Sequence, residues 1–264
     1  MRIGAYQFAV TGVIENNLAA VQRAVSQAND RGVELLIFPE CALTGYPPHT
    51  IKDPSSVDFQ KLSHALNQLQ ETCDSNNMHI IAGSVTRENE RFYNSAILFA
   101  PGKEMQTYHK QALWGWDKDN FTIGNKDGIF EINGWKTGVR ICFEIRFPEF
   151  FRELYKADTD LNIVLFYDTS DEKNAERYEM IRSHIITRAV ENVTYTLSVN
   201  AVCPHQTAPT MLCDRSGDVL GECSPDTESM LIYDLDLDEL TFGQQGRKEV
   251  SDWLLRGRET ARIL

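Results

Sequence analysis

Amphipathic stretches recur along the chain and alternate with short apolar runs. Leu18, Val21, Val25 and Ala28 fall about three or four residues apart, a spacing typical of the buried face of an α-helix. Comparable stretches follow further along. The helices that we predict cover residues 16–31, 59–75, 147–156 and 175–192.

Apolar runs of strand length lie between these helices. The run 33–38 is apolar at all but one position, as in strands that are buried on both faces. Asn133-Gly134 separates two further runs and is a strong hairpin signal. The predicted strands cover residues 3–10, 33–38, 78–84, 95–100, 130–132, 137–141, 161–166, 194–199, 210–213, 219–222 and 229–235. Alternating strands and helices indicate an α/β layered domain.

The pattern contains no internal repeat, linker or low-complexity segment. A chain of 264 residues, of which 42% are hydrophobic, is long enough for a substantial core, so we expect a single domain over residues 1–264. Residues 242–264 mix polar, basic and acidic side chains. This C-terminal tail is either a partner-contact arm or a frayed end.

Composition and charge argue against several classes of function. The formal net charge is −12 and the pI is near 5.0, with no cluster of Lys and Arg to contact phosphates, so nucleic acid is not an expected partner. No apolar run approaches the roughly 18 residues of a membrane span. Met1 leads directly into a predicted strand without a signal-peptide apolar region. We therefore expect a cytoplasmic protein without membrane contact.

The cysteines and histidines show no metal-ligand spacing. The six cysteines form no CxxC pair, no HExxH motif occurs, and the six histidines are scattered. Mostly reduced thiols fit best, with Cys41 as a small packing residue. No metal and no cofactor are expected.

Three residues with reactive side chains lie at or near the ends of apolar runs. Glu40 ends the run 35–40, Lys110 lies within Tyr108–Leu113, and Cys142 ends the run 138–142. If the three runs end at one edge of a sheet, these side chains meet. A thiol needs a base to become a nucleophile, and the oxyanion that it creates needs a positive donor. A Glu, a Lys and a Cys supply both.

These segments together resemble the nitrilase superfamily of carbon–nitrogen hydrolases, which carries a Glu–Lys–Cys triad in this order. The motifs are Phe38-Pro39-Glu40, Tyr108-x-Lys110-x-x-Leu113, and Cys142 followed by Arg146-Phe147-Pro148-Glu149. Weaker matches extend the resemblance from about residue 2 to about residue 235. It implies a four-layer α-β-β-α sandwich, and pairing of two such sandwiches into a homodimer or higher oligomer.

The resemblance also implies roles for the site residues. Cys142 is the expected nucleophile, Glu40 its base, and Lys110 the fixed cation beside the oxyanion, with the backbone N–H of Phe143 as second donor. Many family members have an assisting Glu in the loop after the lysine. Here that position is Asp117, one methylene shorter, so its carboxylate reaches the lysine differently or through water, and Asp119 is a possible substitute.

Loops near the triad supply the weaker candidates for the substrate pocket. Glu144 stands where the family usually has Asp, and we expect it to orient the loop more than to touch substrate. Arg146 either binds a substrate carboxylate or forms a structural ion pair, and the ion pair is favoured. The pocket candidates are Tyr46, Trp114, Trp116, Glu144, Arg146, Asp168 and Thr169, with the 167–170 loop as one wall.

The expected activity is hydrolysis of a small amide through a cysteine thioester, with release of ammonia. Arg146-Phe147-Pro148-Glu149 favours the amidase branch that acts on ω-amides of dicarboxylic acids. N-carbamoyl amines are the next choice of substrate, and nitriles the last. A papain-like Cys–His hydrolase lacks any matching signature. A catalytically silent scaffold of the same fold stays open, although the intact triad argues against it.

Overall fold

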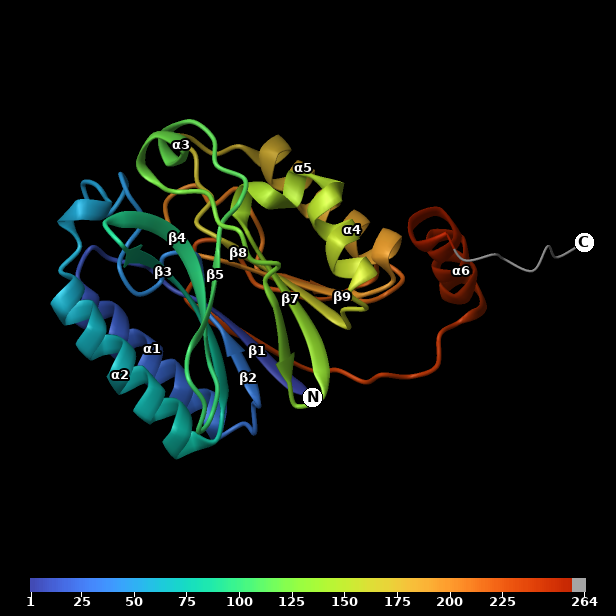
Figure 1. Ribbon diagram of the computed structural model, residues 1–264, viewed down its shortest axis with the longest axis horizontal. Helices are drawn as coiled ribbons and strands as arrows, with labels where there is room; N and C mark the ends of the chain where they lie inside the picture. The colour runs from blue at the N-terminus through green and yellow to red at the C-terminus, as the bar shows by residue number, and fades with distance from the viewer. Residues whose placement is uncertain (258–264) are drawn as a thin grey trace, which may run out of the picture.

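The computed structural model describes residues 1–257 and consists of two mixed sheets packed face to face between two helical layers (Figure 1). The first sheet contains β1 (Arg2–Gln7), β2 (Leu35–Ile37), β3 (His79–Glu88), β4 (Arg91–Phe99), β5 (Gln106–His109) and β12 (Ser229–Asp234). The second contains β6 (Ile129–Ile132), β7 (Trp135–Ile141), β8 (Leu161–Phe166), β9 (Tyr195–Asn200), β10 (Met211–Cys213) and β11 (Val219–Glu222).

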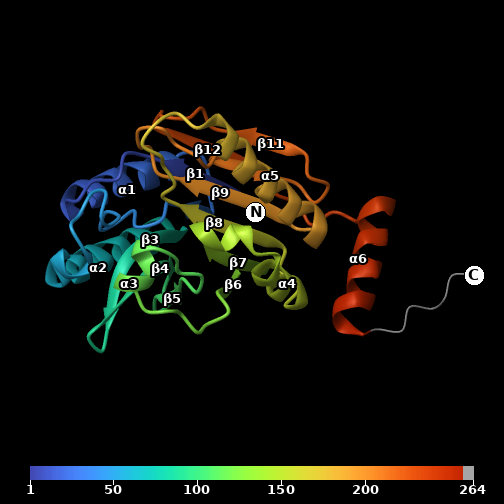
Figure 2. The same cartoon turned by 90° about the horizontal axis from the view of Figure 1, so that it is seen from above.

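Helices cover the outer face of each sheet. The first sheet carries α1 (Ile14–Asn29) and α2 (Phe59–Asn76), and the second carries α4 (Pro148–Lys156) and α5 (Ala175–Asn192) (Figure 2). One apolar cluster lies between α1, α2 and their sheet, and another between α4, α5 and theirs. The expected four-layer α-β-β-α sandwich is therefore confirmed.

The strand order places the ends of the central strands together. The first sheet has the order β12-β1-β2-β3-β4-β5 and the second the order β11-β10-β9-β8-β7-β6. β1, β2 and β3 are parallel, and so are β7, β8 and β9. Parallel strands direct their carboxyl ends to the same edge of a sheet, so the loops that follow them cluster there.

A third apolar cluster joins the two sheets. It includes Ile37 of β2, Ile81 of β3, Ile141 of β7 and Leu165 of β8, each at most 1% exposed. Burial of this surface is the main favourable contribution to folding, and close packing fixes the separation of the sheets. The residues that follow β2 and β7 are thereby held at a defined distance from each other.

The long periodic elements lie where the sequence predicts them. β8, β11 and α5 coincide with the predicted ranges, and Asn133-Gly134 joins β6 to β7. β5 and α3 (Trp116–Asn120) were not predicted, because β5 (Gln-Thr-Tyr-His) contains no apolar run and the five residues of α3 are too few to establish a helical period. β1 ends at Gln7 and is shorter than the predicted run 3–10.

The region predicted as a C-terminal tail contains a helix. α6 (Phe242–Arg256) begins at a Thr241 N-cap and lies beside the sandwich at the end of an extended segment (Figure 1, Figure 2). The frayed-end alternative is therefore wrong for residues 242–256. Residues 258–264, also assigned to this arm, lie outside the described residues. None of the helices within residues 1–257 has the length and apolarity needed to cross a membrane.

Candidate functional site

Loops from both sheets meet at the carboxyl edge of the sandwich. Glu40 follows β2, Lys110 follows β5 and Cys142 follows β7. The backbone N–H of Glu40 donates to the carbonyl of Phe166, the last residue of β8, at 3.3 Å. The loop after β2 is thus bonded directly to the opposite sheet. The three residues come together here as the sequence predicts.

The Glu40 carboxylate is fully buried and accepts three hydrogen bonds. Its Oε1 accepts from the side-chain amide of Asn94 at 2.7 Å and from Nζ of Lys110 at 2.9 Å. Its Oε2 accepts from the backbone N–H of Tyr167 at 2.8 Å. Burial is the largest effect on this group and raises the pKa of Glu40 above its usual value, although Lys110 opposes the shift. A carboxylate with a raised pKa is a stronger base.

Lys110 lies between two carboxylates. Its Nζ donates to Glu40 at 2.9 Å and to Oδ2 of Asp117 at 2.8 Å, and its side chain is 2% exposed. Burial disfavours the charged form, but Glu40 and Asp117 more than offset this effect and raise the pKa of Lys110 well above its usual value. The ammonium group has three donors, so one remains for an oxyanion.

Asp117 reaches the lysine directly. It is the second residue of α3 and is buried, and its Oδ1 accepts from the Tyr46 hydroxyl at 2.9 Å. A water-mediated contact is not needed, because α3 brings the shorter side chain close enough. Asp119 is exposed and makes no side-chain hydrogen bond or ion pair within residues 1–257, so its use in place of Asp117 is wrong.

Cys142 begins a 3₁₀ helix (Cys142–Arg146) in a conformation that is unusual for a side-chain-bearing residue. Its φ is 47°, in the left-handed region, and such backbone strain is often found at functional sites. Burial, followed by the charge of Glu40, raises the pKa of the Cys142 thiol well above its usual value. The thiol therefore requires a base. Phe143, the second residue of this helix, has an N–H without an intrahelical acceptor.

A glycine allows the Glu40 loop to approach β3. A Cβ on Gly83 would lie 2.3 Å from the carbonyl oxygen of Pro39 and 2.6 Å from Cα of Glu40. Any larger residue would displace the loop that carries the carboxylate. Gly83 belongs to a stretch that resembles the family, but its role follows only from this close approach.

Glu144 does not face a pocket, so its placement among the pocket residues was wrong. Its side chain is fully buried. Oε1 accepts from the Tyr108 hydroxyl and from the backbone N–H groups of Gln111 and Ala112, and Oε2 accepts from the backbone N–H of Ile141. These internal contacts agree with the expectation that Glu144 orients its loop.

Aromatic side chains border the site on the Tyr46 side. The Tyr46 and Tyr167 rings stack at 5.0 Å between centroids, and His49 stacks on both. Trp114 is 72% exposed. Trp116 packs edge-on against Phe121. Tyr46 therefore lies at the site through its bond to Asp117, Trp116 lies next to Asp117 in the chain, and Trp114 is exposed to solvent.

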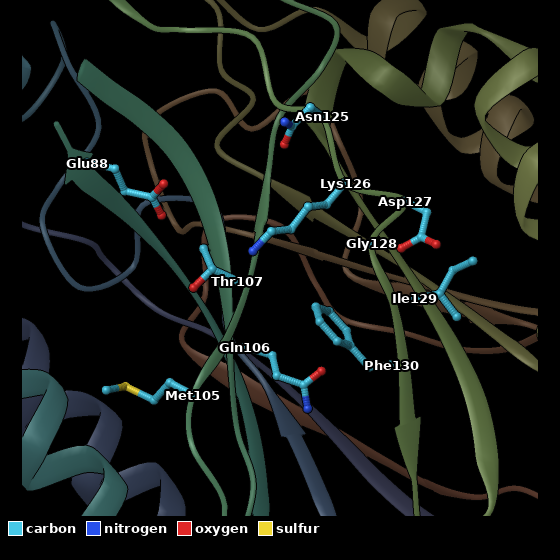
Figure 3. Close-up of a pocket in the computed structure, with 10 residues that line it drawn as sticks. All are labelled: Glu88, Met105, Gln106, Thr107, Asn125, Lys126, Asp127, Gly128, Ile129 and Phe130. Atoms are coloured by element: carbon cyan, nitrogen blue, oxygen red, sulfur yellow. The ribbon is translucent and has the colours of Figure 1, made fainter.

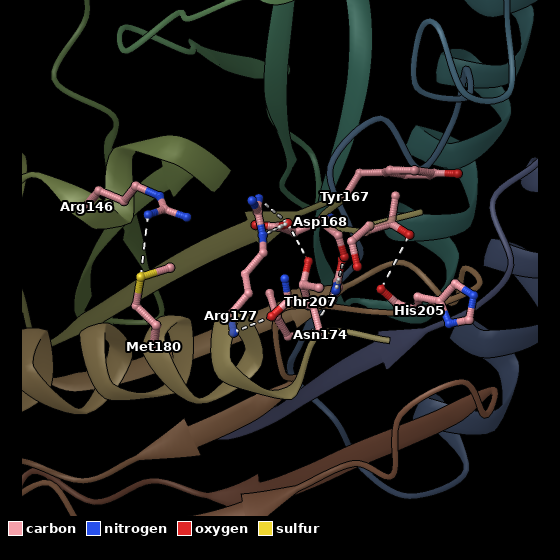
Figure 4. A network of polar contacts seen from close by, with 12 residues as sticks. Arg146, Tyr167, Asp168, Asn174, Arg177, Met180, His205 and Thr207 are labelled. Carbon is pink, nitrogen blue, oxygen red and sulfur yellow. Dashed lines mark hydrogen bonds and ion pairs between the residues drawn. The ribbon is translucent and has the colours of Figure 1, made fainter. Parts of the chain in front are cut away.

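Asp168 belongs to a buried polar network that the sequence did not predict (Figure 4). Its Oδ1 accepts from Nε and Nη2 of Arg177 at 3.1 and 2.7 Å, and from the Thr207 hydroxyl at 2.6 Å. Thr169, the next residue, donates its hydroxyl to the carbonyl of Pro204. This loop is thus tied to α5 and to the segment after β9, and the Asp168 charge is neutralised locally.

Arg146 has no acidic partner within residues 1–257, so the favoured structural ion pair was wrong. Its guanidinium lies 5.9 Å from the ring centroid of Phe143, and its Nη1 lies 3.8 Å from the sulfur of Met180 (Figure 4). A guanidinium ordinarily occurs with a carboxylate or phosphate partner when it is partly buried. Arg146 is therefore available to bind an anion.

Several residues that hold the site were missed from the sequence. Asn94 and Tyr108 are buried in strands and bond to Glu40 and Glu144. The signal was present, because a buried polar side chain in an apolar strand requires a hydrogen-bond partner. Arg177 gave no signal, because it lies on a helix and its partner Asp168 is defined only by the fold.

The structure contains two cavities of about 760 Å³. One is lined by Tyr167, His49, Thr169, Arg177 and His205, among others, and adjoins the aromatic stack. The other lies between the edge strands β5 and β6 (Figure 3) and is lined by none of the triad residues. Within residues 1–257, no group of three or more His, Cys, Asp or Glu side chains is arranged to hold a metal ion.

The geometry predicts how the thiols react. Cys142 and Cys223 are partly exposed, and the other four cysteines are buried. Iodoacetamide should therefore modify Cys142, and Glu40→Gln should slow this reaction by at least about tenfold, because general-base catalysis is lost. In the unmodified protein the rate should fall as the pH falls through the Glu40 pKa, at a midpoint above the ordinary value of about 4.3.

The measurement is peptide mass mapping over a time course, with Cys223 as the internal control. Cys223 should react at the same rate in both proteins. Equal rates at Cys142 with and without the Glu40 carboxylate would exclude Glu40 as the base.

The sequence is similar to those of known carbon–nitrogen hydrolases. The sequence model of the carbon-nitrogen hydrolase family matches residues 2–244. The 2-oxoglutaramate amidase of Bacillus subtilis (strain 168) is 29% identical over 221 residues, which are 81% of this chain and 82% of that protein. The (R)-stereoselective amidase of a Pseudomonas species is 27% identical over 240 residues, or 86% and 82% of the two chains.

Solved structures support the fold. The amidase from Nesterenkonia sp. AN1 superposes with a TM-score of 0.79 at 22% identity, over 90% of this chain and 93% of that chain. A structure of a Glu-to-Gln mutant of that amidase shows the result of Michael addition of acrylamide at the active-site cysteine. The fold is shared, and the family match covers nearly the whole chain. The resemblance seen in the sequence is confirmed, and the chain belongs to the carbon–nitrogen hydrolase family.

Proposed function

We propose that this carbon–nitrogen hydrolase is an amidase that uses Cys142 as nucleophile, Glu40 as base and Lys110 as oxyanion donor. The observation that carries the proposal is the position of Lys110. Its ammonium group bonds to both Glu40 and Asp117 at the edge where Cys142 begins its helix. A buried cation fixed in this way is preorganised to stabilise negative charge on a substrate oxygen.

The first half of the reaction forms a thioester. Glu40 takes the proton of the Cys142 thiol while the sulfur attacks the amide carbon, and the carbonyl oxygen becomes an oxyanion. The remaining donor of Lys110 and the N–H of Phe143 stabilise that oxygen. The protonated Glu40 then gives its proton to the amide nitrogen, the carbon–nitrogen bond breaks, and ammonia leaves.

The second half of the reaction releases the acid. Glu40, again a carboxylate, takes a proton from water as the water oxygen attacks the thioester carbon. The carbon–sulfur bond breaks, the carboxylic acid leaves, and Cys142 recovers its proton. The same carboxylate therefore serves both halves, and its raised pKa favours the two proton transfers near neutral pH.

The acyl group of the substrate carries a carboxylate in this proposal. Arg146 lies four residues after the nucleophile, at the end of the same 3₁₀ helix, and has no acidic partner within the described residues 1–257. The Bacillus subtilis relative is a 2-oxoglutaramate amidase, which supports an ω-amide of a dicarboxylic acid. An N-carbamoyl amine with a carboxylate is the second candidate, because the same guanidinium would bind it.

A substrate panel tests this function. Wild-type protein should release ammonia from ω-amides of dicarboxylic acids faster than from aliphatic amides, carbamoyl compounds or nitriles. Cys142→Ala should lower kcat by a factor of at least about 10⁴, since the covalent route is lost. Arg146→Ala should lower kcat/KM for the carboxylate-bearing amide by about 10- to 100-fold, the usual effect of losing a charged hydrogen bond.

The uncharged aliphatic amide is the control for Arg146→Ala, and its turnover should stay within about threefold of wild type, because it has no carboxylate to bind. Equal losses on both substrates would contradict the assignment of Arg146. Preferential turnover of a nitrile would contradict the proposal of an amide substrate but would not affect the assignment of the triad. No ammonia from any compound, with an intact fold, would favour the silent scaffold.

We also propose that two copies of the chain associate through α6. The helix contacts α4 through polar groups, including a bond from the Tyr155 hydroxyl to the carbonyl of Lys248 at 2.9 Å. Its exposed apolar residues are Phe242, Val250, Trp253 and Leu254, between 53% and 94% accessible. An exposed apolar stripe of this kind marks an interaction surface. It supports the interpretation of this region as a partner-contact arm.

Sedimentation measurements test this association. The wild-type protein should sediment as a dimer or a larger oligomer, and Trp253→Glu should shift it toward the monomer because a charge would be buried in the contact. Ile123→Glu, at a residue 63% exposed outside α6, is the matched control and should leave the oligomer intact. A monomeric wild type, or identical behaviour of both variants, would contradict the proposal.

A cytoplasmic location is supported by the cysteines. All six are unpaired, as in proteins of reducing compartments. The acidic net charge of −12 supports a small molecule over nucleic acid as partner. Recovery of the native protein in a secreted fraction, or salt-dependent DNA binding, would contradict these proposals.

A further inference from the structure

Glu144 connects the two loops that carry the lysine and the cysteine. Its Oε1 accepts from the Tyr108 hydroxyl at 2.7 Å, from the N–H of Gln111 at 2.6 Å and from the N–H of Ala112 at 3.3 Å. Its Oε2 accepts from the N–H of Ile141 at 2.6 Å. The side chain is fully buried, and both oxygens are used.

These donors lie next to the catalytic residues in the chain. Gln111 follows Lys110, and Ile141 precedes Cys142. Within the part of the chain that the structure describes, every hydrogen bond between residues 108–112 and residues 141–146 ends on the Glu144 carboxylate. The first segment extends from the first sheet and the second from the other. A single side chain therefore links the backbones of the two loops.

Among the described residues, the other contacts of Lys110 reach the second sheet through Glu40 and do not include the Cys142 turn. The N–H of Lys110 bonds to the carbonyl of Asn94, its carbonyl accepts from the N–H of Gly124, and its ammonium group bonds to Glu40 and Asp117. Glu40 bonds in turn to the backbone of Phe166 and Tyr167 at the end of β8, and not to residues 141–146. The oxyanion, however, forms between Lys110 and the N–H of Phe143, which moves with Cys142. Preorganised donors act only where the charge develops, and a displacement of about 1 Å can cost about 100-fold in rate.

We propose that Glu144 is a positioning residue that sets the separation between the Lys110 ammonium and the Cys142 turn, and hence the geometry of the oxyanion site. This inference rests on the proposed function, because it assigns Lys110 to the oxyanion. Glu144 touches no reacting atom. Its ionised form is required, since a carboxylate accepts on both sides whereas an amide accepts on only one.

The test compares amide hydrolysis with alkylation of the thiol. Glu144→Gln turns one acceptor into a donor that faces an N–H group, so kcat for the best ω-amide should fall about 100-fold while KM changes by less than about threefold. Alkylation of Cys142 by iodoacetamide should change by less than about threefold, because displacement of iodide needs the thiol and its base but no oxyanion donor.

Rescue by the conservative variant is the second readout. Glu144→Asp keeps the charge and is shorter by one methylene, so it should lose about tenfold in kcat and stay clearly above Glu144→Gln. Tyr108→Phe removes one of the donors and should lose about fivefold. Glu131→Gln, at an exposed position of β6 where the side chain makes no hydrogen bond or ion pair within residues 1–257, is the control and should match wild type.

All rates are expressed per alkylatable Cys142, which corrects for any misfolded fraction. The inference is overturned if kcat per site in Glu144→Gln equals wild type, or if alkylation and hydrolysis fall in parallel. If Glu144→Gln does not fold, Glu144→Asp and Tyr108→Phe provide the test: in each, kcat should fall more than the rate of Cys142 alkylation. If the wild-type protein hydrolyses no amide, the proposed function is refuted instead, because there is then no kcat that the Glu144 variants could lower.

Discussion

The site depends on one buried cation shared by two carboxylates. Lys110 bonds to Glu40 at 2.9 Å and to Asp117 at 2.8 Å, and none of the three side chains is more than 7% exposed. Removing charges from water is costly, and loss of one partner from such a group typically costs about 3–5 kcal/mol. The cluster is stable only because every oxygen in it has a donor: Asn94 and the backbone of Tyr167 for Glu40, and Tyr46 for Asp117.

The packing of the two sheets sets the dimensions of this cluster. Glu40 and Lys110 extend from the first sheet, and Cys142 and Tyr167 from the second. The bond from the Tyr167 backbone to Glu40, at 2.8 Å, is possible only if the sheets keep their separation. The apolar cluster between them is close-packed and therefore resists change. The apolar side chains between the sheets thus hold the geometry of the site, although they do not contact a substrate.

Much of the fold and the triad could be predicted because each has a local signal. Periodicity marks α5 and β8, and the ends of apolar runs mark Glu40 and Cys142. The contacts across the fold have no such signal. Asp117 reaches Lys110 only because the short helix α3 turns it inward, and Asp168 meets Arg177 only because α5 packs beside β8. Arg146 and Glu144 were misassigned for the same reason, since their partners are set by tertiary structure.

Two departures from the family pattern appear in this chain, and they concern the lengths of acidic side chains. Asp117 is one methylene shorter than the family's Glu, and Glu144 is one methylene longer than the family's usual Asp. The structure accommodates both: α3 carries Asp117 close to Lys110, and the longer Glu144 spans the gap between two loops. The departures therefore give little support to a silent scaffold.

The central claim is that Cys142 forms a thioester under the control of Glu40 and Lys110. The most direct test mixes the protein with a slow amide substrate, quenches it in acid and determines the intact mass, followed by peptide mapping. The account predicts a mass increase equal to the amide less ammonia, located on Cys142, which disappears as the acid product is released. Ammonia release without an adduct, or an adduct on any other residue, would contradict it.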